Sequence, residues 1–162
     1  MCIVIDTCCL ASVFDGDNEK HSKFAPVLNW IDKGKGCMIY GGTKYNSELG
    51  RATKILNIVT EFSRRRKTIQ IPNATVDPIA SALKVKFPSP EVDDEHIVAL
   101  VIASRCCVVC TNDNKAISYL RNKGVFSDYS GVNRPSIFRG HKTHGKLCCD
   151  QHIVGVCREQ SS

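Results

Sequence analysis

The chain has 162 residues, of which 43% are hydrophobic and 23% charged, which is the size and composition of one globular domain. No apolar stretch is long enough to span a bilayer, and the N-terminus carries no signal peptide pattern. We therefore expect a cytoplasmic protein that does not enter membranes. The net charge of +6 favours a polyanionic partner.

The predicted strands are short apolar runs, and they alternate with segments in which apolar residues recur at helical spacing. This alternation is typical of βαβ units around a mainly parallel sheet, so we predict an α/β fold. The strands are predicted at residues 2–6, 37–40, 68–71, 106–111 and 136–138, the last of them at an edge of the sheet.

The predicted helices begin at residues that suit helix starts. Thr43 is expected to cap one helix, and Asp77-Pro78 to open another, because proline fits the first helical position. The helices are predicted at about 22–33 and 43–65, from 77 to before 87, from 93 or 94 onward, and at 116–123.

The cysteines are the most unusual feature of the composition, because the chain contains ten of them. Most fall inside apolar runs, as at Cys2, Cys37, Cys106, Cys107 and Cys110. Free cysteine in a reducing compartment behaves as a small buried hydrophobe. We therefore expect core packing, not a disulfide framework.

The last part of the chain differs from the rest. Residues 1–140 are predicted to form one domain, whereas residues 141–162 lose clear periodicity and are rich in Lys, His and Cys. We expect this basic tail to be loosely ordered. A zinc site there is a weaker alternative, because the tail lacks a clean pair of Cys-x-x-Cys or His-x-x-x-His elements.

Four acidic residues, Asp6, Glu48, Asp94 and Asp113, stand where strands end or on predicted helices. Open parallel sheets bind ligands beyond the carboxyl ends of their strands, so Asp6 and Asp113 are expected to face one crevice. Carboxylates so close repel each other unless a cation lies between them, and oxygen ligands suit Mg²⁺ or Mn²⁺. The pattern therefore predicts a metal-dependent phosphodiester-cleaving site.

The residues around these acids resemble the motifs of one family, the PIN-domain ribonucleases. Ile3-Val4-Ile5-Asp6-Thr7 resembles the opening strand of that family, and Ser47-Glu48-Leu49-Gly50-Arg51 resembles its second acidic motif. Asp94 followed by Ile97-Val98-Ala99 is similar to the third, and Val108–Asp113 to the fourth, a strand that ends in Thr-x-Asp. The order and approximate spacing of the four motifs also agree.

The resemblance extends to about residue 140. It implies a three-layer α/β/α fold with a central, mainly parallel sheet, and hydrolysis of RNA with Mg²⁺ or Mn²⁺. It implies that Asp6, Glu48, Asp94 and Asp113 are both catalytic residues and metal ligands, with Thr111 and Thr7 supporting them. We expect Asp6 and Asp113 to be the closest ligands, because they follow strands, and the other two to act through water or a second ion.

Four neighbours of these acids need an interpretation of their own. Asp93 or Glu95 would replace Asp94 if the helix were shifted by one residue, but the apolar spacing favours Asp94, with Asp93 as the cap. We expect His96 on the helix surface. Arg51 lies one turn from Glu48, and we prefer an ion pair between them to a contact with substrate phosphate.

The densest basic patch is Arg64, Arg65, Arg66 and Lys67. Phosphate binding and a solvated helix C-terminus explain this run equally well, since cations are favoured at helix C-termini.

The biological role of the protein is implied only by its resemblance to the PIN-domain ribonucleases. Many stand-alone members of this size are toxins held inactive by a small antitoxin protein, and relatives commonly form homodimers. The alternative is a catalytically inactive PIN-like RNA-binding or scaffold module in a larger assembly, which would show a degraded acidic set, yet all four positions are filled here. A haloacid-dehalogenase-type phosphotransferase is excluded, because it needs an aspartate where this chain has Cys8.

Overall fold

The computed structural model describes residues 2–88 and 93–149. It contains a five-stranded sheet in the order β3-β2-β1-β4-β5, with parallel pairing throughout, which confirms the predicted α/β fold. The strands are β1 (Cys2–Ile5), β2 (Cys37–Gly41), β3 (Thr68–Ile71), β4 (Val108–Cys110) and, at the edge, β5 (Ser136–Phe138).

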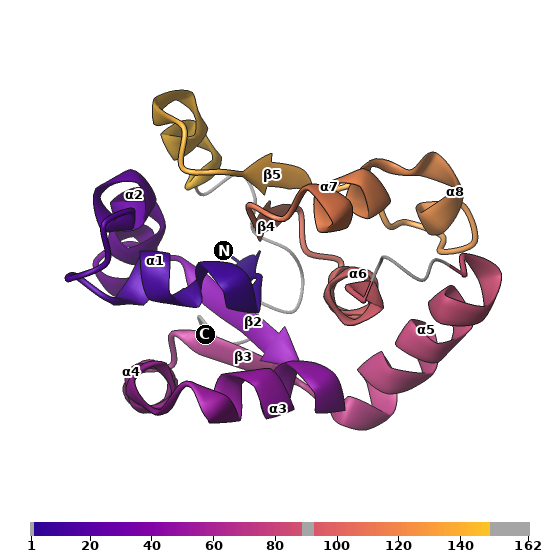
Figure 1. Ribbon diagram of the computed structural model, residues 1–162, viewed down its shortest axis with the longest axis horizontal. Helices are drawn as coiled ribbons and strands as arrows, with labels where there is room; N and C mark the ends of the chain where they lie inside the picture. The colour runs from indigo at the N-terminus through magenta and orange to yellow at the C-terminus, as the bar shows by residue number, and fades with distance from the viewer. Residues whose placement is uncertain (1, 89–92, 150–162) are drawn as a thin grey trace.

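Helices cover both faces of the sheet, as Figure 1 shows: α1, α2 and α4 lie on one side and α5 to α8 on the other. Right-handed crossovers require this, because the chain first moves from β1 toward β3 and then crosses to β4 and β5. The helices are α1 (Leu10–Phe14), α2 (His21–Asp32), α3 (Thr43–Arg51), α4 (Thr53–Arg64), α5 (Asn73–Lys86), α6 (Glu95–Ser104), α7 (Asn114–Arg121) and α8 (Lys123–Phe126), with 3₁₀ turns η1 (Thr7–Cys9) and η2 (Lys142–Leu147).

The core is built on β1 and α6. All four residues of β1 are fully buried, and α6 packs against β1, β2 and β3 as well as α5. Because α6 is enclosed on most sides, even its first two residues, Glu95 and His96, are buried. Polar groups at the start of α6 are therefore held inside the molecule.

The position at which the strand order reverses lies between β1 and β4. The chain leaves β1 toward β2, whereas β4 pairs with the other edge of β1, with Ile5 opposite Cys110. The residues that follow these partners, Asp6 and Thr111, therefore meet at the carboxyl edge of the sheet. Ligands of doubly wound sheets bind at this kind of switch point.

The predicted helix over residues 43–65 is wrong in two details. It is two helices, which are separated at Ala52 (φ −101°, ψ 72°). The break changes the direction of the chain, so that α4 buries Ile55 and Val59. Thr43 does not cap α3, because Gly42 occupies the cap at φ 85°, where a Cβ would lie 2.8 Å from Val76 Cγ1.

The predicted start of the next helix at Asp77-Pro78 is also wrong. Helix α5 begins at Asn73, directly after Pro72, which has the extended ψ of 141°. Pro78 consequently lies inside the helix. The predicted strand over residues 106–111 is shorter in the structure, as β4 contains three residues.

Eight cysteines in the described ranges form no disulfide, as predicted, but Cys2 is disulfide-bonded, which corrects the expectation for that residue. Most of the tail lies outside the described residues. Its first part forms η2, which packs against β5 and α2, and the Arg139 N–H donates to His144 Nδ1 (3.0 Å). In the ranges 2–88 and 93–149, no helix has the length and apolarity needed to cross a membrane.

Candidate active site

Asp6 is the first residue after β1, and its carboxylate is fixed and almost fully buried (4% exposed). Its backbone N–H donates to the Cys110 carbonyl (2.9 Å), which extends the β1–β4 pairing by one residue. Thr111 Oγ1 donates to Asp6 Oδ2 (2.6 Å), and the Cys8 N–H approaches Oδ1 (3.4 Å). The register of the sheet thus determines the position of this carboxylate.

Thr111 also connects Asp6 to Asp113. The hydroxyl of Thr111, which is fully buried, accepts a hydrogen bond from the Asp113 N–H (3.1 Å). Asp113 then caps α7, since its Oδ1 accepts from the N–H groups of Lys115 (2.6 Å) and Ala116 (3.3 Å). One carboxylate oxygen therefore holds the start of α7, which orients the side chain at the carboxyl edge of the sheet.

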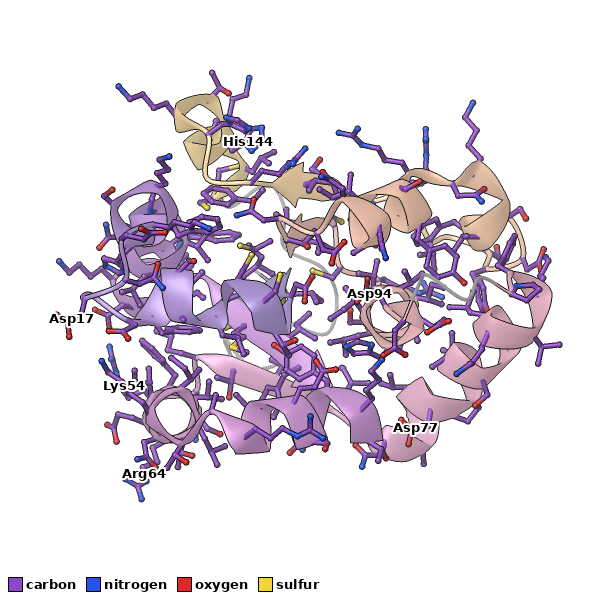
Figure 2. The ribbon with its side chains drawn as sticks, viewed as in Figure 1. Asp17, Lys54, Arg64, Asp77, Asp94 and His144 are labelled. Atoms are coloured by element: carbon purple, nitrogen blue, oxygen red, sulfur yellow. The ribbon has the colours of Figure 1, made fainter. Side chains whose placement is uncertain are left out.

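Asp94 faces the same crevice from α6. Burial, followed by the negative charges of Asp6 and Asp113, raises the pKa of Asp94 to about 6, although Lys44 opposes this rise. Asp94 occupies the N-cap position of α6, yet its side chain makes no capping hydrogen bond. Figure 2 shows Asp94 beside α6, near the centre of the picture. Three carboxylates from separate elements therefore repel one another across one crevice.

Glu48 lies beside this crevice on α3. Its Oε2 accepts a hydrogen bond from Thr7 Oγ1 (2.6 Å), and Thr7 directly follows Asp6. Helix α3 is joined to the end of β1 by Tyr45, whose hydroxyl donates to the Ile5 carbonyl (2.5 Å). Burial raises the pKa of Tyr45 well above its usual value, and the charges of Asp6 and Glu48 add to this effect. Both predicted threonines thus support a predicted acid.

His96 was predicted on the helix surface, and this is wrong: the residue is 5% exposed. Its Nδ1 lies 3.2 Å from the Asp93 carbonyl, and its Nε2 lies 3.5 Å from Glu48 Oε2 without meeting hydrogen-bond geometry. Burial lowers the pKa of His96, so the ring is neutral at pH 7. The signal for burial was present in the sequence, since the helix that His96 opens is apolar on all sides.

The two acids that flank Asp94 point elsewhere. Asp93 is not the cap: it is exposed and forms an ion pair with Lys44 (2.5 Å), whose hydrogen bond lowers the pKa of Asp93. Glu95 is buried near Tyr119, whose pKa is raised to about 12 by burial and then by the charge of Glu95. Asp94 is therefore the acid of this group that faces Asp6 and Asp113.

The expected ion pair between Arg51 and Glu48 is not found among the described residues, because Glu48 contacts Thr7 and His96 instead. Arg51 lines a cavity of about 590 Å³ that adjoins Glu48. This cavity lies between α3, α5 and the start of α6, so it is next to the acidic crevice.

The basic run at residues 64–67 is far from the acids. It directly precedes β3, so it lies at the amino edge of the sheet, opposite to Asp6 and Asp113. Figure 2 shows Arg64 at the periphery, well separated from Asp94. Arg65 pairs with Asp32 (2.7 Å), and Lys67 Nζ donates to the Gly34 carbonyl (2.6 Å). The run therefore has structural partners and does not contact the crevice.

The thiols beside Asp6 do not form a nucleophilic site. Cys8 Sγ and Cys9 Sγ lie 3.7 Å apart. The hydrogen bond to Cys9 and burial raise the pKa of Cys8, and the hydrogen bond to Cys110 raises that of Cys9. Since only a thiolate acts as nucleophile or metal ligand, both side chains remain inert at neutral pH.

Across residues 2–88 and 93–149, no group of three or more Asp, Glu, His or Cys side chains is arranged to hold a metal ion directly. The donors that face the crevice are carboxylate oxygens, which suit hard cations. Mg²⁺ retains several waters and uses only one or two carboxylates directly, so it does not need three converging ligands. The donor set therefore fits a hydrated Mg²⁺ or Mn²⁺ ion.

No family model, curated protein or solved structure matches this chain. The functional case therefore rests on the geometry and charge of the site, together with the motif resemblance.

Proposed function

We propose that this protein is a divalent-metal-dependent nuclease that hydrolyses RNA phosphodiester bonds at the crevice of Asp6, Asp94 and Asp113, with Glu48 beside it. The observation that carries the proposal is the mutual repulsion of the three carboxylates. Burial, and then the charges of Asp6 and Asp113, raise the pKa of Asp94 to about 6. Repulsion of this kind destabilises the fold and is relieved when a cation binds.

The residues of the chain have separate roles in this proposal. One or two of Asp6, Asp94 and Asp113 would hold the ion directly and the rest through its waters. A bound Mg²⁺ or Mn²⁺ supplies activation of water and neutralisation of phosphate charge. Thr111 fixes Asp6 by donating to Oδ2 (2.6 Å). Thr7 fixes Glu48 by donating to its Oε2 (2.6 Å), and Glu48 also borders the cavity.

The choice of RNA as the substrate rests on the resemblance to PIN-domain ribonucleases. The same resemblance supports a cytoplasmic toxin restrained by a small antitoxin protein, and a homodimer. The alternative function, an inactive PIN-like RNA-binding or scaffold module, requires the acids to have structural roles only. Asp94 argues against it, because this residue occupies a cap position and makes no capping hydrogen bond.

Labelled single-stranded RNA incubated with the protein in Mn²⁺, Mg²⁺ or EDTA tests the proposal. We expect cleavage that requires metal and that falls by at least about 10²-fold in Asp6→Asn. Asp17→Asn is the matched control, because Asp17 is exposed and lies at the far side of the molecule (Figure 2). Cleavage that persists in EDTA, or that Asp6→Asn leaves unchanged, would refute the proposal. Intact RNA under every condition would favour the inactive module.

A further inference from the structure

The cavity beside Glu48 is a groove between two diverging helices. At their shared corner, Asp77 accepts hydrogen bonds from the Thr43 N–H (2.9 Å) and Oγ1 (2.6 Å), and Asn46 Nδ2 donates to Asn73 Oδ1 (2.9 Å). From this corner α3 and α5 separate, and the start of α6 lies between them (Figures 1 and 2). The groove is open because the two helices are joined at one end only.

The walls of the groove are small or polar. Helices that pack closely interlock through large apolar side chains, and neither wall presents one, so the space of about 590 Å³ is not filled by the protein itself. The wall residues recur at intervals of three and four along each helix. They are Thr43, Lys44, Ser47, Glu48 and Arg51 on α3, and Asp77, Ala80, Ser81 and Lys84 on α5.

Each wall carries an exposed cation without an ion-pair partner among the described residues: Arg51 on α3 and Lys84 on α5. The third cation, Lys44, is already paired with Asp93 (2.5 Å). Arginine and lysine presented in this way bind phosphate groups. The acids that also line the groove, Asp77 and Asp93, are already hydrogen-bonded or paired, so the two exposed cations at the rim are available to phosphate groups.

The floor of the groove has the opposite chemistry. Glu48 and Glu95 contribute carboxylates, which only accept hydrogen bonds. His96 adds a buried Nε2 atom with no hydrogen-bond partner, on a side chain that is 6% exposed. Buried polar atoms without partners cost free energy, so this atom marks a place where a ligand or its water completes the site. A ligand must therefore bring N–H donors to the floor and negative charge to the rim.

We propose that this groove binds one unpaired nucleotide of the substrate strand, next to the bond that is cleaved, with its phosphates at Arg51 and Lys84. The proposal rests on the proposed function, because Glu48 borders both the groove and the acidic crevice. The exocyclic amino group of adenine, cytosine or guanine would donate two N–H groups to the floor, whereas uracil has no amino group and offers only its single N3–H. Bases within a duplex are stacked and cannot enter, so the substrate is single-stranded here.

Binding is tested separately from cleavage by using Asp6→Asn as the background for every variant. Fluorescence anisotropy with labelled single-stranded A, C and U octamers measures the affinity and its salt dependence. In the double variant Arg51→Ala/Lys84→Ala, the affinity is expected to fall at least tenfold. The slope of log affinity against log salt concentration is expected to become shallower by about 1.4, because two phosphate contacts are lost. Lys33→Ala/Arg64→Ala removes the same charge away from the groove and should change the affinity less than twofold.

A neutral variant separates the groove from general charge effects. Ser81→Trp fills the space between the walls and is expected to weaken binding at least tenfold, while the melting temperature stays within about 2 °C because Ser81 is exposed. The U octamer is expected to bind at least fivefold more weakly than the A and C octamers. Equal binding of all three octamers, or unchanged binding by both groove variants, would overturn the proposal.

The two proposals fail in different ways. If the wild type cleaves RNA and the groove variants bind RNA as the Lys33/Arg64 control does, the groove proposal alone is wrong. If the groove variants weaken binding but the wild type cleaves no RNA with any metal, the groove proposal stands and the nuclease proposal is wrong.

Discussion

Asp94→Asn is expected to stabilise the folded protein at pH 7 to 8 and, at the same time, to remove metal-dependent cleavage. Burial and the charges of Asp6 and Asp113 raise the pKa of Asp94 from 3.8 to about 6. The folded state therefore retains a proton that the unfolded state releases between these two values, so stability falls as pH rises through this window. Above it the penalty is constant, roughly 1–2 kcal/mol after allowance for solvent screening.

Urea denaturation from pH 3.5 to 8 measures this effect without added metal. The Asn variant should be more stable than the wild type above pH 6, and the difference should vanish below pH 4. Asp93→Asn is the matched control, because the hydrogen bond to Lys44 lowers the pKa of that neighbour, so its replacement should not stabilise. An Asp94→Asn variant that is less stable than the wild type at pH 7.5 would show that this carboxylate has a structural role.

Thr111→Val is expected to destabilise the protein by about 2–3 kcal/mol at pH 7 and to reduce cleavage strongly. Valine has the shape of threonine but lacks the hydroxyl that donates to Asp6 Oδ2 (2.6 Å) and accepts from the Asp113 N–H (3.1 Å). Since Thr111 is fully buried, water cannot easily replace either bond. The two strand-end acids would also lose their common support.

Thr111→Ser is the control for this change, because it retains the hydroxyl and removes only a methyl group. Its loss of stability should be about 1 kcal/mol, and its cleavage rate should remain close to that of the wild type. Free energies from urea denaturation and initial cleavage rates provide the two readouts. Equal losses in the Val and Ser variants would mean that the hydroxyl does not position Asp6.

The sheet could be predicted from sequence because its strands have a strong local signal. Four fully buried apolar residues form β1, and the strands at residues 68–71 and 136–138 have the predicted bounds. The position of Asp6 beside Thr111 follows from parallel pairing and needs little more than the strand order. The crevice of Asp6 and Asp113 was predictable for the same reason.

The features that sequence reasoning missed depend on tertiary contacts. The break at Ala52 has no proline and only Gly50 as a local signal, and α3 and α4 pack in different directions on either side of it. The apolar residues on all sides of α6 signalled the burial of the helix, but the burial of His96 at its start also depends on how many elements surround α6. The cavity could not be predicted, because its walls belong to helices whose spacing is determined by the bonds between Thr43 and Asp77.

Calorimetric titration of Mn²⁺ into the metal-free protein at pH 7.5 is the most direct test of the acidic crevice as a metal site. We expect at least one ion to bind the wild type, and Asp6→Asn to weaken that binding by more than about 10²-fold. Asp17→Asn should bind Mn²⁺ as the wild type does. Absence of binding to the wild type, or equal binding by Asp6→Asn, would contradict a metal-dependent site at the carboxyl ends of β1 and β4.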